Sequence, residues 1–109
     1  MSAEGFRHVA FPFEGDRFPP HLGAVVQRTV LTGQEPARVV IHDEDNDWLI
    51  SDGVNDPNLG GASVVACISH IAAADPAVAA LATLPLGHVA ERDEQHLPWT
   101  ISVHAWPDE

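Results

Sequence analysis

The 109-residue chain is long enough for one domain with a single hydrophobic core, and its 45% apolar content is ordinary for a globular protein. Sixteen Asp and Glu residues against five Lys and Arg leave a formal net charge of −11. This charge repels phosphate backbones and anionic membrane surfaces, so it argues against nucleic-acid binding and membrane docking and favours a basic partner.

The single cysteine and the N-terminus bear on the cellular compartment. Cys67 cannot form an intramolecular disulfide, and its apolar surroundings predict a buried thiol. The N-terminus lacks a signal-peptide pattern, and no window approaches the roughly 20 apolar residues of a membrane span. We expect a cytoplasmic protein.

The first predicted unit, residues 1–22, is an extended segment rich in phenylalanine and proline. All four phenylalanines of the chain, at positions 6, 11, 13 and 18, lie in it, and their apolar area favours packing on the domain over a disordered tail. Residues 23–109 are expected to form an α+β core, so that residues 1–109 make a single domain.

Three strands and a loop are predicted next. The β-branched residues of "GAVVQRTVLTG" indicate a strand over about residues 24–30. The apolar runs "ARVVIH" (37–42) and "DWLIS" (47–51), separated by short polar residues, predict a hairpin. The Gly, Asn, Asp and Pro residues of "DGVNDPNLGG" (52–61) predict an exposed loop.

Two consecutive helices are expected after this loop. Ser63 can cap a helix in which apolar residues recur at spacings of three and four through "VVACISHIAAA", until Asp75 and Pro76 stop it. The same Asp75 can cap a second helix with Pro76 at its first position, which continues to Leu84 and ends at Pro85 and Gly87.

The last third reads as two strands around a polar turn near residues 93–98. Alternation in the final strand predicts one face toward the core and one toward water; the expected core residues are Trp99, Ile101 and Val103, and the expected solvent residues are Thr100, Ser102 and His104. Together the elements predict an α+β fold: an antiparallel sheet of about four to five strands built from two hairpins, with the two helices on one face.

The segment "HDEDNDW", residues 42–48, is the densest cluster of potential ligands in the chain. Its aspartates match the first acidic positions of an EF-hand loop, but Trp48 and Val54 stand where that loop needs glycine and a bidentate glutamate. We therefore expect the solvated turn of a hairpin, in which Asn46 tolerates a left-handed backbone. Weak cation binding by the carboxylates stays open.

Histidines offer a second kind of site. If residues 92 and 100 pair, His88 and His104 face each other across the last hairpin, and His42 could complete a zinc site with them. Solvated strand histidines are the alternative. The serines lie outside any GxSxG elbow, so no catalytic residue is predicted.

The order of several weak motifs adds a resemblance. They are the Pro36-led strand, the acidic hairpin before Trp48, the Asp-Pro pair between the helices, the segment "LPLGHVAER" and the final tryptophan strand, over about residues 28–100. This succession resembles a family of small bacterial proteins related to immunity protein thirty-three. The resemblance implies an α+β domain, and for some members the neutralisation of a toxin by binding it.

Two functions from different classes are therefore expected. The first is a non-enzymatic, cofactor-free acidic module that binds a basic protein, and in its more specific form an immunity-type protein that neutralises this partner. Its predicted binding residues are Asp43, Glu44, Asp45, Asp47, Asp52 and Asp56 on adjacent loops, with Trp106 as an anchor. The second is a metal-dependent enzyme or sensor that uses His42, His88 and His104 with the loop at residues 43–47.

Overall fold

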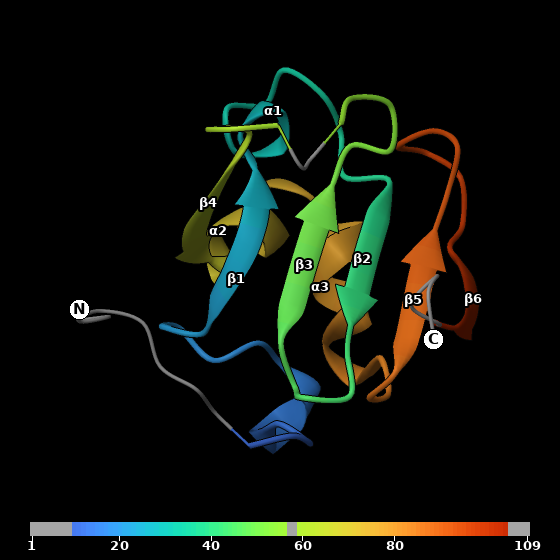
Figure 1. Cartoon of the computed structure of the whole chain (residues 1–109). Helices are drawn as coiled ribbons and strands as arrows, with labels where there is room; N and C mark the ends of the chain where they lie inside the picture. Colours follow the sequence, from blue (N-terminus) through green and yellow to red (C-terminus); the bar gives the residue numbers. More distant parts are fainter. Residues whose placement is uncertain (1–9, 57–58, 105–109) are drawn as a thin grey trace.

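Six strands form one mixed sheet in the computed structural model, which describes residues 10–56 and 59–104 (Figure 1). The sheet order is β4-β1-β3-β2-β5-β6, with β1 parallel to β3 and every other neighbouring pair antiparallel. The strands are β1 (Gly23–Gln27), β2 (Val39–His42), β3 (Trp48–Ser51), β4 (Ser63–Cys67), β5 (His88–Glu91) and β6 (Thr100–Val103).

The helices are short, and α2 and α3 lie together against one face of the sheet (Figure 1). The helical elements are η1 (Glu14–Asp16), α1 (Arg28–Leu31), α2 (Ile68–Ala74), α3 (Pro76–Ala79) and η2 (Ala80–Thr83), of which η1 and η2 are 3₁₀ turns. Within the described ranges, no helix has the length and apolar character needed to cross a membrane. The α+β class is confirmed.

The sheet itself corrects the prediction of four to five antiparallel strands. It has six strands, and β1 runs parallel to β3, with Val25 opposite Leu49 and Val26 opposite Ile50. This pairing joins residues about one fifth of the chain apart, so no local turn signal announces it. A hairpin between neighbouring strands does leave such a signal, because its turn needs particular residues.

β4, the strand that the sequence did not predict, occupies residues assigned from the sequence to the start of a helix. Ser63–Cys67 pairs along its whole length with β1, and the helix α2 begins only at Ile68. Val64 and Val65 are β-branched and suit a pleated strand, and the pairing with β1 outweighs the helical spacing of the run. Cys67 is consequently half-buried at a strand end rather than buried on a helix.

The strand predicted over residues 24–30 ends earlier than expected. β1 stops at Gln27, and the helical turn α1 follows, in which Val30 packs into the core. The predicted first hairpin is confirmed, since β2 and β3 pair with His42 opposite Trp48. The predicted last hairpin is confirmed as well, with Glu91 opposite Thr100.

The prediction that the apolar face of the last strand packs against the core is wrong. Ile101 and Val103 share one face of β6, but they are 51% and 72% exposed, because β6 is the edge strand and lies beyond α2 and α3 (Figure 1). Only Trp99, just before β6, packs partly against the core.

The core lies between the sheet and the helices and extends into the N-terminal segment. Phe13 is buried in the core, and Phe11 and Phe18 pack against it, as expected for a segment wrapped on the domain; Phe6 lies outside the described residues. The other members of this cluster are Leu22, Ala24, Val26, Val30, Ala37, Val40, Trp48, Ile50, Ala66, Ile68, Ile71, Val78, Leu81, Ala82, Leu84 and Ala90.

A buried ion pair joins the helices to the last hairpin. Arg92 Nη2 lies 2.6 Å from Asp75 Oδ2, and the Arg92 side chain also donates to the Ala37 and Gln95 carbonyls. Its guanidinium lies 4.0 Å from the centre of the Trp99 ring. Asp75 Oδ1 accepts from the Ala77 N–H, which confirms the predicted N-cap with Pro76 at the first helical position. One carboxylate therefore caps α3 and neutralises a buried cation.

Replacing Asp75 with alanine is expected to lower the free energy of unfolding by about 3–5 kcal/mol, because Arg92 would keep a buried charge without its partner. Urea denaturation at neutral pH measures the loss. Glu35→Ala is the matched control, since the Glu35–Arg38 pair is more exposed and should contribute less than about 1 kcal/mol. Equal losses in the two variants would contradict the importance assigned to the buried pair.

Candidate functional site

The tip of the β2–β3 hairpin is a tight turn built around the carboxylate of Asp43. Asp43 Oδ1 accepts from the N–H groups of Asp45 and Asp47, both at 2.9 Å. The Asp43 N–H donates to the Asp47 carbonyl, and the Asn46 N–H donates to the Asp43 carbonyl. Asn46 has φ +66°, the left-handed backbone expected for it. The prediction of a hairpin turn is confirmed.

The base of this hairpin is rigid because His42 and Trp48 are buried against each other. Their ring centroids lie 3.9 Å apart with an interplanar angle of 12°. His42 Nδ1 lies 2.6 Å from the Leu84 carbonyl oxygen, and Nε2 lies 2.6 Å from Asn46 Oδ1. The imidazole thus links the hairpin tip to the chain after η2. Phe11 packs edge-on against the same ring.

Gly87, the residue before β5, helps to place Glu44 at the tip. Gly87 has φ +73°, and a Cβ added to it would lie 3.2 Å from Glu44 Cγ, so the close approach and the left-handed backbone both require glycine. The Gly87 N–H donates to the His42 carbonyl at 2.7 Å. The hairpin is therefore braced at its base and along one side.

The carboxylates at the tip are not neutralised by an ion pair within the described residues. Glu44, Asp45 and Asp47 are exposed, Asp43 is half-buried, and none of them forms an ion pair with a described residue. The chain has no lysine. Of the four described arginines, Arg28, Arg38 and Arg92 donate to backbone carbonyls or to internal carboxylates. Arg17, the fourth, is exposed just after η1, so the tip carboxylates keep their charge without an ion-pair partner among the described residues.

The same turn gathers a set of potential cation ligands. One carboxylate oxygen from each of Asp43, Asp45 and Asp47 lies within 4.8 Å of the others, the one such grouping of three or more His, Cys, Asp or Glu side chains in the described part of the chain. Oxygens at this separation can share a Ca²⁺ ion at its usual 2.3–2.6 Å. Asp43 Oδ1 already accepts two N–H groups, so the set is small and open to water.

The predicted histidine site is not assembled. His42 lies opposite His88 on adjacent strands, but His88 lies opposite Val103, not His104. The register differs by one residue from the pairing of 92 with 100, and a shift of one residue turns a side chain to the other face. His42 is buried with both ring nitrogens hydrogen-bonded, so it does not present a nitrogen to a shared metal.

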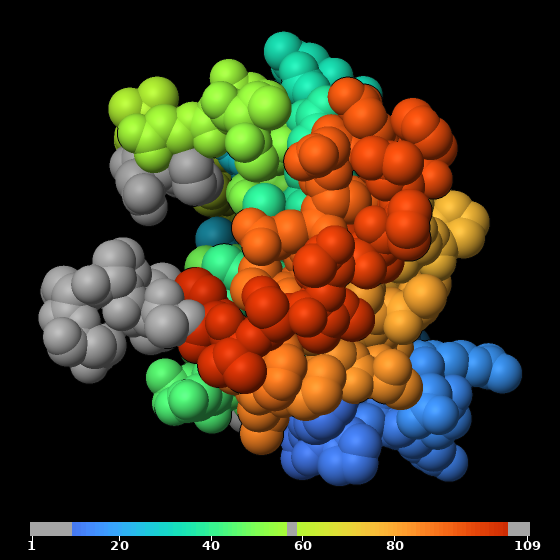
Figure 2. Space-filling model, turned by 90° about the vertical axis from the view of Figure 1, so that its right-hand side faces the viewer, coloured from blue at the N-terminus to red at the C-terminus, as the bar shows by residue number. Residues whose placement is uncertain are grey.

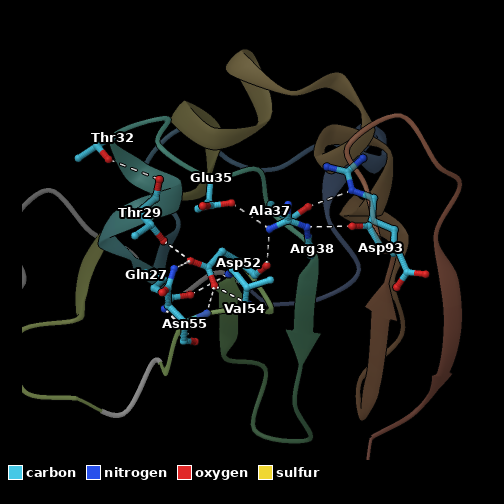
Figure 3. A network of polar contacts seen from close by, with 11 residues as sticks. Gln27, Thr29, Thr32, Glu35, Ala37, Arg38, Asp52, Val54, Asn55 and Asp93 are labelled. Atoms are coloured by element: carbon cyan, nitrogen blue, oxygen red, sulfur yellow. Dashed lines mark hydrogen bonds and ion pairs between the residues drawn. The ribbon is translucent and has the colours of Figure 1, made fainter.

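The predicted acidic surface is also corrected, because Asp52 is buried inside the domain. Its Oδ1 accepts from the N–H groups of Val54 and Asn55, and its Oδ2 accepts from the Thr29 hydroxyl and the Asn55 side chain (Figure 3). The Asp52 N–H donates to Gln27 Oε1, and Gln27 Nε2 donates to the Asn55 carbonyl. Asp52 holds a loop to β1 and cannot meet a partner.

The remaining predicted acid, Asp56, is exposed, but it does not lie beside the hairpin tip. Residues 43–47 precede β3 and residues 52–56 follow it, so the two groups sit at opposite ends of that strand rather than on adjacent loops (Figure 1). Trp106, the predicted anchor, lies outside the described residues.

Sequence reasoning missed the polar partners of Asp52. The run Asp52-Gly53-Val54-Asn55 does carry a local signal, because an aspartate that accepts from N–H groups two and three residues later is a known turn pattern. Gln27 and Thr29 carry no comparable signal, since they are more than 20 residues away in the chain.

Comparisons of the chain with protein-family models, with curated proteins and with solved structures found no match. The candidate function therefore rests on the geometry and charge of these residues.

Burial alone would raise the pKa of Asp52, but hydrogen bonds from Asn55, Thr29 and Val54 outweigh it and lower the pKa from 3.8 to about 2. A carboxylate with a lowered pKa stabilises the fold above its unfolded pKa, and this contribution is lost as the pH falls from about 4 toward 2.

Asp52→Asn is expected to cost about 1–3 kcal/mol at pH 7, because its NH₂ group would face donors that the carboxylate now satisfies. The stability difference between wild type and variant should shrink as the pH is lowered through this window. Urea denaturation at several pH values measures it, with the exposed Asp93→Asn as control. Parallel pH profiles for wild type and Asp52→Asn would contradict the assignment.

Proposed function

We propose that this protein is a non-enzymatic binding module whose acidic hairpin tip, residues 43–47, meets a basic protein. The observation that carries the proposal is a rigid turn whose exposed carboxylates form no ion pair with a described residue. Three of its four described arginines, Arg28, Arg38 and Arg92, are hydrogen-bonded within the fold, and the net charge of the chain is −11, so the exposed charge is predominantly negative.

The rigidity of the hairpin matters for binding as much as its charge. The stacked His42 and Trp48 rings and the Asp43 hydrogen bonds hold the tip before any partner arrives. A partner then gains contacts without the entropic cost of ordering a loop. Complementary charge would mainly accelerate the encounter, so the association rate should depend strongly on salt.

The resemblance of residues 28–100 to proteins related to immunity protein thirty-three supports a more specific form of this proposal. In that form the partner is a toxic protein with a basic surface, and binding neutralises it. A cofactor and a catalytic residue are not part of this function. Pull-down from the native host with the full chain, followed by binding kinetics with the recovered protein, tests it.

Neutralising the tip with Glu44→Gln, Asp45→Asn and Asp47→Asn is expected to slow association with the recovered partner at least tenfold at low salt. It should also flatten the dependence of the association rate on ionic strength, because these carboxylates supply the long-range attraction. Surface plasmon resonance at several salt concentrations measures both effects. The three side chains are exposed, so the fold should be unaffected.

The matched control removes the same number of charges elsewhere. Glu91→Gln, Asp93→Asn and Glu94→Gln neutralise three exposed carboxylates that form no ion pair with a described residue. This variant should keep most of the association rate. An equal decrease of the association rate in both variants would show that only the net charge matters and not the tip. An association rate that does not depend on ionic strength would refute electrostatic binding.

A second candidate function, weak divalent-cation binding, is favoured by the grouping of Asp43, Asp45 and Asp47 oxygens. The histidine part of a metal site is not supported, because His42 is buried and His88 does not face His104. Only the carboxylates would then hold the ion.

Calorimetric titration with CaCl₂ should give a dissociation constant on the order of 1 mM, the weak end of known calcium sites, because the carboxylate set is small and open. Asp45→Asn with Asp47→Asn should abolish the heat, whereas Asp93→Asn with Glu94→Gln should not. A titration without heat in the wild type would eliminate this candidate.

A further inference from the structure

β6 is an edge strand: within the described part of the chain, no strand pairs with its outer side. The His104 N–H donates to the Gly87 carbonyl, and on the other side of β5 the Arg92 N–H donates to the Arg38 carbonyl. Since backbone groups alternate along an antiparallel strand, Thr100 and Ser102 also face β5. The N–H and C=O groups of Ile101 and Val103 therefore point outward, away from the sheet.

Two of the devices that usually protect an edge, charge and proline, are absent from β6. Thr100–Val103 contains no charged residue and no proline, although the chain carries a net charge of −11. Edge strands of monomeric proteins are commonly blunted by lysine, proline or bulges. An uncharged and open edge in so acidic a protein is suited to strand pairing.

Apolar side chains are concentrated around the same edge. Of nine large apolar side chains exposed in the described part of the chain, four lie on β6, in the segment before it or in the turn before the neighbouring strand β5: Ile101, Val103, Leu97 and Leu86. Figure 2 views this side of the molecule, with the red β6 at its centre and the orange residues of β5 and the preceding turn beside it. The edge therefore offers apolar area in addition to backbone hydrogen bonds.

We propose that β6 pairs antiparallel with β6 of a second copy of this chain, with the two-fold axis at Ser102. In this register Ile101 of one copy lies opposite Val103 of the other, and each such pair exchanges two backbone hydrogen bonds. The two sheets become one continuous sheet. Symmetry also brings the Leu86 end of one edge beside the Leu97 end of its partner.

Charge and symmetry favour a second copy over a charged partner at this edge. A basic segment would find no carboxylate on β6 to meet, whereas β6 paired with itself sets neutral side chains against neutral ones. In this register Ile101 and Val103, whose backbone groups face outward, pair with each other on both sides of the axis. The two copies therefore use the same surface, as an isologous contact requires. The inference does not depend on the proposed function, because the acidic tip belongs to another part of the surface.

Sedimentation velocity of the full chain from about 5 to about 500 µM tests the proposal, because dimerisation follows mass action. The weight-average mass should rise toward twice the 11.7 kDa of the chain. Ile101→Lys and, separately, Val103→Lys should keep the mass at that of the monomer over the same range. Both side chains are exposed, so a folded variant is expected, and circular dichroism verifies it.

Val65→Lys is the matched control, since Val65 is 57% exposed at the centre of the opposite edge strand, β4, and its substitution should leave the dimer intact. Hydrogen exchange followed by NMR adds a direct readout: the amides of Ile101 and Val103 should become protected as concentration rises. A monomer at the highest concentration, a dimer that survives both β6 lysines, or one that Val65→Lys disrupts would each overturn the proposal.

Discussion

The buried carboxylate of Asp52 is the constraint on which the arrangement of the sheet depends. The carboxylate accepts hydrogen bonds from the loop after β3 and from Thr29 in α1. The backbone N–H of Asp52 donates to Gln27 at the end of β1. These contacts join the ends of the two parallel strands, which no turn connects. A buried ion is costly without strong compensation, and here several N–H and O–H donors provide it. With β1 fixed beside β3, β4 can add to its other side and complete the sheet.

Local chemistry made part of this fold predictable. The β2–β3 hairpin, the left-handed Asn46, the Asp75 cap and the packing of Phe13 each follow from a few neighbouring residues. The parallel β1–β3 pair, the strand β4 and the one-residue register of β6 depend on distant partners and left no such signal. The same division runs through the candidate site. The turn at residues 43–47 was foreseen, whereas the burial of Asp52 and the separation of the histidines required the tertiary structure.

The distribution of charge is as important as its total. Arg92 and Arg38 are drawn into the fold, where they neutralise Asp75 and Glu35 and satisfy several carbonyl groups. This use of the few cations stabilises the interior and leaves the surface with unbalanced carboxylates. Solubility alone would account for a negative surface, but it would not require a tip held by stacked rings and an Asp43 turn. The rigid presentation of the carboxylates therefore supports the proposed binding role over solubility alone.

Self-association through β6 is compatible with so acidic a chain because the carboxylates at the hairpin tip lie away from the symmetry axis. The tip is at the end of the sheet where His88 pairs with Val103, and a two-fold axis at Ser102 sends the second tip to the opposite end. Charges separated by more than a Debye length, about 8 Å at physiological salt, repel only weakly. The neutral strand can then bring two chains together while each acidic tip remains open. A dimer would thus offer two separated binding tips, and a partner with repeated basic surfaces would gain avidity from it.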